Sequence, residues 1–291
     1  MAAYENRYWW SRDGLRLHYR DYAGREDRPP ILCLPGLTRN ARDFEVLADR
    51  LAGDWRVIAV DLRGRGESAY AKDAMTYTPL TYVQDIEALL EELGCDRFVA
   101  FGTSLGGIVT MLLAGMVPQH IVGALLNDVG PEIEAAGLAR IRTYVGKASS
   151  WPTWMHAARA VAEGNADVYP GYETADWLAM AKRLYRLNNS GRVVLDYDLR
   201  IAEPFKIPGN EAAPDMWPAL RGLAEAPVLL VRGGRSDVLG AATAERMVAA
   251  LPKAELVTVP DVGHAPTLDE PDVATAIDRL LDRVAKEPTP A

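Results

Sequence analysis

The sequence predicts an α/β protein in which a mostly parallel sheet is flanked by helices. Short apolar runs, each the length of a strand buried on both faces, alternate with longer segments of helical periodicity over most of the chain. The 291 residues suffice for one large α/β domain with an inserted segment. A composition of 49% hydrophobic and 25% charged residues is that of an ordinary globular protein. We therefore expect parallel strands joined by right-handed helical crossovers.

The core elements follow in chain order. A β-hairpin comes first, with arms at 8–10 and 15–20 joined by a type I′ turn at Asp13-Gly14. The predicted buried strands cover 31–34, 57–60, 97–101, 121–126, 228–231 and 255–259, and the predicted helices cover 44–51, 80–93, 108–114, 241–251 and 273–284.

The segment from Pro131 to Leu220 differs from the rest of the chain. Buried-strand runs are scarce here, four of the seven tryptophans fall within it, and helical periodicity appears at 133–145, 153–162 and 176–187. We therefore expect a helical cap domain at 131–220, inserted into an α/β core formed by 1–130 and 221–291.

Charge and cysteine content limit the classes of partner. The formal net charge is −8, which argues against nucleic acid or an anionic membrane as the main partner. Cys33 and Cys95 are too few for a disulfide framework, so we expect buried thiols and a cytoplasmic protein. The first residues lack the pattern of a signal peptide, and no apolar run reaches the ~18 residues that cross a bilayer.

The stretch Gly102-Thr103-Ser104-Leu105-Gly106-Gly107 lies between a predicted strand and a predicted helix. This strand, Gly-x-Ser-x-Gly, helix pattern is typical of a nucleophile elbow, a sharp turn that exposes the serine hydroxyl. The glycines are needed because the turn brings the strand and helix backbones close together. We therefore predict Ser104 as a nucleophile, as opposed to part of a plain glycine-rich turn.

A serine hydroxyl needs a general base and an acid that orients the base. Of the four histidines, only His264 follows the last predicted strand at its carboxyl end, where open α/β sheets place their ligands. We expect the others to be a packing or surface residue (His18), a residue on the far side of the sheet (His120) and a plain helix residue (His156).

Two aspartates compete for the role of the orienting acid. Asp237 follows the strand at 228–231, and Asp128 follows the strand at 121–126. We favour Asp237, because Asp128 has an alternative role as a turn carboxylate before Gly130-Pro131. For the oxyanion hole we predict the backbone N–H groups of Leu105, directly after the serine, and Leu37, because Pro35 has no N–H to donate.

Five motifs fit one family: Leu34-Pro35-Gly36, the run at 61–68, the elbow at 102–107, the run at 232–237 and Gly263-His264-Ala265-Pro266. With these motifs the chain resembles the α/β-hydrolase superfamily over nearly its whole length. The resemblance implies a serine, aspartate, histidine triad in the order Ser104, Asp237, His264. It also implies an eight-stranded sheet whose second strand is antiparallel, and a helical cap after the sixth strand.

Within that superfamily, the motifs favour a serine esterase. Haloalkane dehalogenases and epoxide hydrolases carry aspartate where this chain has Ser104. Hydrolases of carbon–carbon bonds in aromatic degradation carry a longer His-Gly-Ser-Gly-Pro loop than Pro35-Gly36-Leu37-Thr38, so they rank second, together with enol-lactone hydrolases. A third hypothesis, from another class, is a small-molecule receptor with vestigial hydrolase activity.

The expected substrate is a small ester or lactone with an apolar or aromatic group. The tryptophans of the cap favour such a group, and Trp151 and Trp154 near Pro152 are the predicted substrate contacts. No His-x-x-x-His or Cys-x-x-Cys pattern occurs, so we expect no metal and no other cofactor. We expect a monomer or homodimer without nucleic-acid or membrane partners.

Overall fold

The computed structural model describes residues 2–206 and 215–286. Within them an eight-stranded sheet has the order β1-β2-β4-β3-β5-β6-β10-β11. β2 is antiparallel to both of its neighbours, and the other pairs from β4 to β11 are parallel, which confirms the predicted mostly parallel sheet. The strands are β1 (Tyr4–Trp10), β2 (Arg16–Tyr22), β3 (Ile31–Leu34), β4 (Val57–Asp61), β5 (Phe98–Thr103), β6 (Ile121–Asn127), β10 (Val228–Gly233) and β11 (Ala254–Val259).

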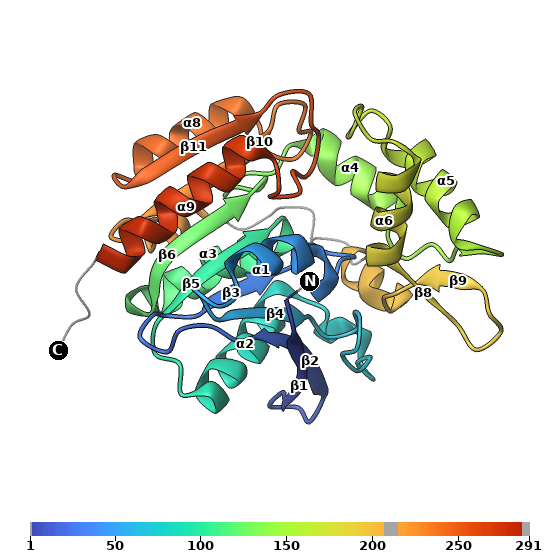
Figure 1. Ribbon diagram of the computed structural model, residues 1–291, viewed down its shortest axis with the longest axis horizontal. Coiled ribbons are helices and arrows are strands. Elements are labelled where there is room, and N and C mark those ends of the chain that lie inside the picture. Colours follow the sequence, from blue (N-terminus) through green and yellow to red (C-terminus); the bar gives the residue numbers. More distant parts are fainter. Residues whose placement is uncertain (1, 207–214, 287–291) are drawn as a thin grey trace.

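Helices cover both faces of this sheet (Figure 1). Successive strand residues point to opposite faces, so in β3 Ile31 and Cys33 join one apolar cluster while Leu32 and Leu34 join the other. The first cluster is closed by α1 (Glu45–Leu51) and α9 (Pro271–Lys286). The second is closed by α2 (Pro79–Leu93), α3 (Leu105–Met116), α7 (Trp217–Arg221) and α8 (Ala241–Ala250). Short 3₁₀ helices link these elements at η1 (Ala41–Phe44), η2 (Ala74–Thr76) and η3 (Pro118–His120).

Helix α2 shows how the sequence sets the ends of an element. Thr78 caps its N-terminus, with the hydroxyl accepting from the Thr81 N–H, and Pro79 occupies the first turn, where no N–H is required. Gly94 ends the helix in the left-handed conformation, with φ +58°.

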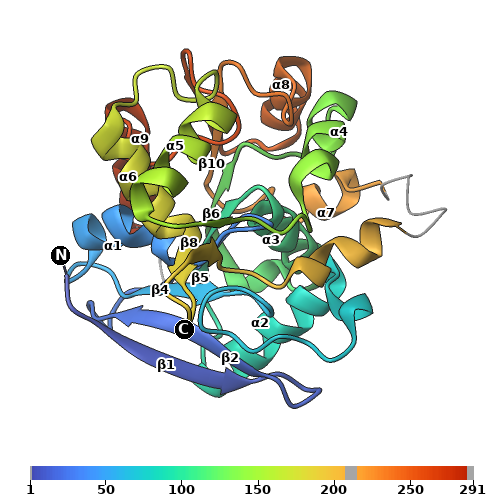
Figure 2. The same cartoon turned by 90° about the vertical axis from the view of Figure 1, so that its right-hand side faces the viewer.

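Between β6 and β10 the chain leaves the sheet and builds a separate layer to one side of it, on the right in Figure 1 and facing the viewer in Figure 2. This layer has its own small apolar core, centred on Val161, Tyr169, Trp177 and Met180. Part of the predicted cap, 207–214, lies outside the described residues. The elements are α4 (Ala135–Tyr144), β7 (Ser150–Trp151), α5 (Trp154–Asn165), α6 (Thr174–Leu184), β8 (Tyr185–Leu187), β9 (Val193–Leu195) and η4 (Leu199–Lys206).

The predicted helix at 176–187 is too long at its end. Helix α6 stops at Leu184, and Tyr185–Leu187 forms strand β8, which pairs with β9 in a small sheet of order β7-β9-β8. The hairpin turn between them contains Gly191 at φ +72°. Helical periodicity within 176–187 carries no information about β9, the later strand with which Tyr185–Leu187 pairs. The switch from helix to strand after Leu184 was therefore not predicted.

The predicted type I′ turn of the first hairpin is also wrong. That turn requires positive φ at both central residues, whereas of Asp13 and Gly14 only Gly14 has it, at +76°. The loop is longer: the Gly14 N–H donates to Ser11 O at 2.9 Å, and Trp10 pairs with Arg16.

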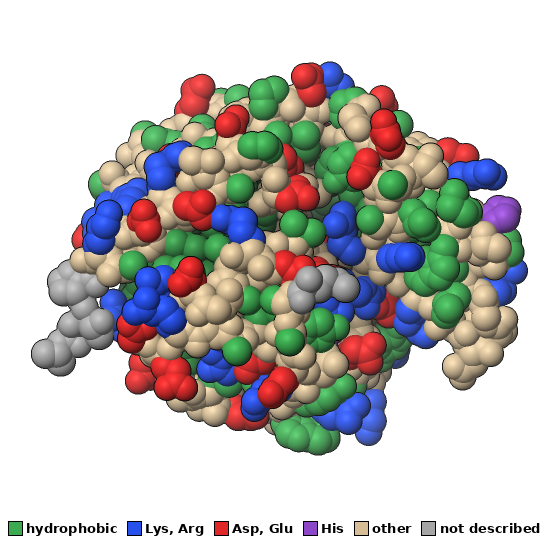
Figure 3. All heavy atoms as spheres, viewed as in Figure 1, with side chains coloured by type: hydrophobic (Ala, Val, Ile, Leu, Met, Phe, Trp, Pro, Cys, Tyr) green, Lys and Arg blue, Asp and Glu red, His purple; other side chains and the backbone are tan. Residues whose placement is uncertain are grey.

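The surface charges, the helices and the two cysteines can be compared with the expectations about partners and buried thiols. Acidic and basic side chains are interspersed over the face shown in Figure 3. None of the helices in the described ranges combines the length and apolarity needed to cross a bilayer. Cys33 is buried, and this burial raises the pKa of its thiol, whereas Cys95 is only half-buried, contrary to the prediction.

The packing of α3 against the sheet gives a testable prediction. A Cβ at Gly106 would lie 2.0 Å from the Leu34 carbonyl oxygen, whereas one at Gly164 in α5 would meet nothing within 4 Å. We expect Gly106→Ala to lower the free energy of unfolding by at least about 2 kcal/mol. The control Gly164→Ala should leave it unchanged or raise it by up to about 1 kcal/mol, because alanine favours helix. Urea unfolding followed by circular dichroism measures both, and equal stability of the two variants would contradict the packing argument.

Candidate active site

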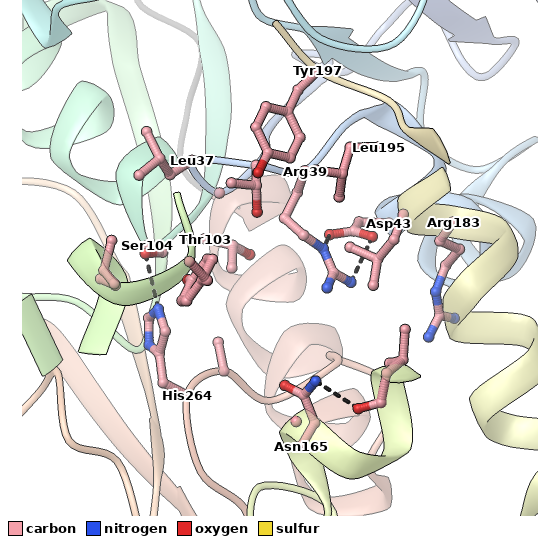
Figure 4. Close-up of a pocket in the computed structure, with 18 of the residues that line it drawn as sticks. Leu37, Arg39, Asp43, Thr103, Ser104, Asn165, Arg183, Leu195, Tyr197 and His264 are labelled. Atoms are coloured by element: carbon pink, nitrogen blue, oxygen red, sulfur yellow. Dashed lines mark hydrogen bonds and ion pairs between the residues drawn. The ribbon is translucent and has the colours of Figure 1, made fainter. Parts of the chain in front are cut away.

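Ser104 occupies the turn between β5 and α3. Its backbone has φ +52° and ψ −115°, a region that L-residues rarely adopt. The turn is possible because Gly102 and Gly106 lack side chains: a Cβ at Gly102 would lie 2.5 Å from the Gly106 carbonyl oxygen. The strained turn lifts the serine out of the line of the strand and directs it toward the cavity described below (Figure 4).

His264 lies in the loop after β11 and contacts two polar side chains. Its Nε2 is 2.9 Å from Ser104 Oγ, and its Nδ1 is 2.7 Å from Asp128 Oδ2. An ionised carboxylate only accepts hydrogen bonds, so Nδ1 donates to Asp128 and Nε2 is left to accept the proton of the Ser104 hydroxyl. The predicted pairing of Ser104 with His264 is thus present in the geometry.

The predicted orienting acid Asp237 does not reach His264; Asp128 takes that place. Asp128 follows β6, and it is completely buried. Its carboxylate also accepts from the Gly233 N–H at 2.8 Å and from the Ser236 hydroxyl at 2.6 Å. Three donors therefore stabilise one charge at the edge of the sheet.

Asp237 instead forms an ion pair with the cap. Arg140 on α4 donates from Nε and Nη2 to its two oxygens, at 2.5 and 2.8 Å. These hydrogen bonds hold the pKa of Asp237 below its ordinary value. The loop after β10 turns back at Ser236, whose N–H donates to Gly233 O at 3.0 Å, so that Ser236 and not Asp237 meets the carboxylate of Asp128. Asp128 follows β6, which pairs with β5, and this pairing in the fold brings its carboxylate to the edge of the sheet where His264 lies.

The cap holds the backbone of the residues that flank His264. The Gly263 N–H donates to Val168 O at 2.9 Å, and the Tyr169 hydroxyl donates to Ala265 O at 2.6 Å. Both cap residues come from the segment that follows α5. The histidine loop is therefore held by the cap as well as by the core.

Leu37 and Leu105, the predicted oxyanion donors, both lie beside Ser104. Gly36 is so close that a Cβ on it would be 3.7 Å from Ser104 Cβ. Its carbonyl accepts from the Arg39 N–H at 3.1 Å, which fixes the plane of the peptide that carries the Leu37 N–H. The Leu37 carbonyl accepts from Arg65 Nε at 2.9 Å, which fixes the next peptide. Leu105 is the first residue of α3, where backbone N–H groups have no partner within the helix.

Ser104 and His264 line a cavity of about 540 Å³ between the core and the cap. Trp151, one of the two predicted substrate contacts, is part of its wall and packs against Tyr185 with a ring separation of 4.6 Å. Trp154 is not part of the wall and instead packs onto the cap's own apolar core. Sequence reasoning could not separate the two, because both precede or begin the same helix.

The cavity wall also carries charge that the sequence analysis did not anticipate. Arg39 is paired with Asp43 at 2.5 and 2.8 Å, and Arg140 with Asp237. Arg183, from the end of α6, has no ion pair within the described ranges, and its Nε is buried without a hydrogen-bond partner. The wall is thus mixed in character, with apolar, aromatic and cationic parts.

The remaining histidines lie away from this cavity. His18 is buried, with Nδ1 2.7 Å from Asp61 Oδ2 and Nε2 2.9 Å from Asn6 Oδ1. His156 is exposed on α5, where its Nδ1 is 2.8 Å from the hydroxyl of the helix cap Thr153. Over residues 2–206 and 215–286, no three side chains of the metal-binding types come together.

Comparisons with known proteins agree with this architecture. A model of the alpha/beta hydrolase family matches residues 31–277. The 3-hydroxybutyrate-oligomer hydrolase of Cupriavidus necator is 34% identical over 277 residues, covering 88% of this chain and 89% of that protein. The 2-(acetamidomethylene)succinate hydrolase of Mesorhizobium japonicum is 28% identical over 255 residues, covering 87% and 88%.

A solved structure also has this architecture. The crystal structure of an alpha/beta hydrolase from Novosphingobium aromaticivorans is 60% identical, covers 97% of this chain and 99% of that one, and superposes with a TM-score of 0.93. The family match spans most of the chain and includes Ser104, Asp128 and His264. This protein is a member of the alpha/beta hydrolase family.

Proposed function

We propose that this hydrolase cleaves carboxylic esters through an acyl-enzyme, with Ser104 as nucleophile, His264 as general base and Asp128 as the residue that orients the base. The observation that carries the proposal is the pair of hydrogen bonds, 2.9 and 2.7 Å, that joins the three side chains at the wall of the cavity. A short polar chain of this kind activates a serine that is otherwise a weak nucleophile at neutral pH.

In the first half of the reaction, Ser104 Oγ attacks the ester carbonyl while His264 Nε2 takes the hydroxyl proton. The tetrahedral intermediate places its negative oxygen at the N–H groups of Leu37 and Leu105, each worth on the order of 3 kcal/mol of transition-state stabilisation. His264 then gives its proton to the departing alcohol. Asp128 stays ionised and stabilises the imidazolium.

In the second half, a water molecule gives a proton to His264 and attacks the acyl group on Ser104. The collapse of this intermediate returns the proton to Ser104 and releases the acid. The proposal needs no cofactor, and its partner is the small-molecule ester alone. The name of the Cupriavidus relative, 3-hydroxybutyrate-oligomer hydrolase, supports hydrolysis of a bond between hydroxy-acid units as the reaction type. A cytoplasmic location stays a prediction from the cysteine content.

The direct test is Ser104→Ala. We expect kcat for hydrolysis of p-nitrophenyl acetate and butyrate to fall by at least about 10⁴-fold, because the remaining residues bind the substrate without supplying a nucleophile. Initial rates measured against enzyme-free blanks give the ratio. Near wild-type rates in Ser104→Ala would refute the acyl-enzyme mechanism. If the wild type does not hydrolyse these esters, lactones and ring-cleavage diketones are assayed next. If those fail too, a test for tight single-turnover binding of a small molecule follows.

A second test separates the two aspartates. Asp128→Asn should lower kcat by about 10⁴-fold, since the amide no longer fixes the imidazole tautomer or stabilises its charge. Asp237→Asn is the matched control: it removes a partly exposed ion pair with Arg140 and a through-space interaction with His264, but no hydrogen bond to His264, and we expect kcat to stay within about threefold of wild type. Thermal unfolding of both variants checks that they fold. The opposite order of activities would return the role of orienting acid to Asp237.

A further inference from the structure

We infer that Arg183 receives a carboxylate of the substrate, so that the enzyme selects esters that themselves carry a carboxylate group. The inference rests on the proposed ester hydrolysis and adds the chemical class of the substrate. In Figure 4, Arg183 lies across the cavity from Ser104 and His264, with Arg39 and Asp43 between them.

The first argument is the pairing of the cavity's arginines. Arg39 and Arg140 each donate two hydrogen bonds to one carboxylate, so their charges are compensated within the protein. In the described part of the chain Arg183 has no such carboxylate, and its Nε is shut off from solvent without an acceptor. The two terminal nitrogens of Arg183 are not among the buried atoms and have no hydrogen-bond partner within the described residues. A ligand carboxylate offers the planar pair of oxygens that fits these two nitrogens.

The second argument is the way the backbone of Arg183 is held. Its carbonyl oxygen accepts hydrogen bonds from Asn40 Nδ2 at 2.9 Å and from Arg42 Nε and Nη2 at 3.1 and 2.9 Å. These donors come from the segment of the core just after the Leu37 turn. The backbone of Arg183 is therefore fixed relative to Leu37. Because less backbone motion is lost on binding, the entropic cost of binding a ligand across the cavity is lower.

The third argument is charge balance. The protein carries a net charge of −8, so a cation that has no ion pair within the described residues does not follow, in this cavity, from a generally basic composition. The cavity wall contains a second cation without an ion-pair partner in the described ranges, the exposed Lys147.

Two pairs of esters test the inference. In the first pair the carboxylate is on the acyl side: mono-p-nitrophenyl glutarate and the neutral p-nitrophenyl methyl glutarate. In the second it is on the alcohol side: acetoxybutanoate and its methyl ester. We expect the wild type to show at least about tenfold higher kcat/KM for the carboxylate member of one pair or both.

Arg183→Met should lower kcat/KM for the preferred carboxylate about 10- to 100-fold, mainly through KM, and leave the neutral partner within about threefold. Lys182→Met is the matched control, because it removes a positive charge from the neighbouring exposed residue, which does not line the cavity. It should keep the preference. If Arg183→Met does not fold, Arg183→Lys keeps the charge without the fork and should lose part of the preference.

No preference in either pair, or an equal loss for charged and neutral members in Arg183→Met, would overturn the inference. If no member of either pair is hydrolysed, or if hydrolysis persists in Ser104→Ala, the proposed function fails instead. Calorimetric titration of the Ser104→Ala protein with glutarate and acetoxybutanoate then decides independently of turnover. Binding that is lost when Arg183→Met is added to the Ser104→Ala protein supports the carboxylate site. If neither glutarate nor acetoxybutanoate binds, the inference is overturned.

Discussion

The site depends on how closely α3 can approach β3 and β5. The Gly106 backbone lies against the Leu34 carbonyl, and Gly102 lies against Gly106, at separations that leave no room for a Cβ. Only with this approach can Ser104 adopt φ +52° at the carboxyl edge of the sheet. The same approach places the first N–H groups of α3 beside the turn at Gly36 and Leu37, so one packing constraint sets both the nucleophile and the anion-binding groups.

A second constraint is the buried charge of Asp128. It lies at the end of β6, between the strand of Ser104 and strand β10, and collects donors from Gly233, Ser236 and His264. A carboxylate with no solvent contact is tolerable only when such donors replace water. The turn after β10 and the histidine loop after β11 are thus tied to one anion, which explains why the loop of Ser236 is directed inward and Asp237 outward to Arg140.

Much of this was predictable from sequence, and the failures have specific physical causes. The alternation of apolar strands and helices gave the sheet, and the glycine pattern around Ser104 with the strand-end position of His264 gave the pair that the structure brings together. The choice between Asp128 and Asp237 failed because both follow strands, and only the backbone path of 233–237 decides which carboxylate turns inward. Strand β8 was missed because its partner β9 supplies the stabilisation. Arg183 has no ion pair among the described residues, and this could not be predicted, since it depends on which carboxylates fold near it.

Two hydrogen bonds join the cap to the backbone around His264, one accepted by the Val168 carbonyl and one donated by the Tyr169 hydroxyl, and they bear on how such a protein can be altered. If the cap only covered an active site that the core had already formed, it could be exchanged for the cap of a relative without loss of the site. Here the cap supplies two of the contacts that hold the loop of the base. A chimera that grafts a foreign cap onto this core must therefore bring equivalents of these two residues. The substrate range of this protein is then easier to change through point changes in the cavity wall than through replacement of the whole insertion.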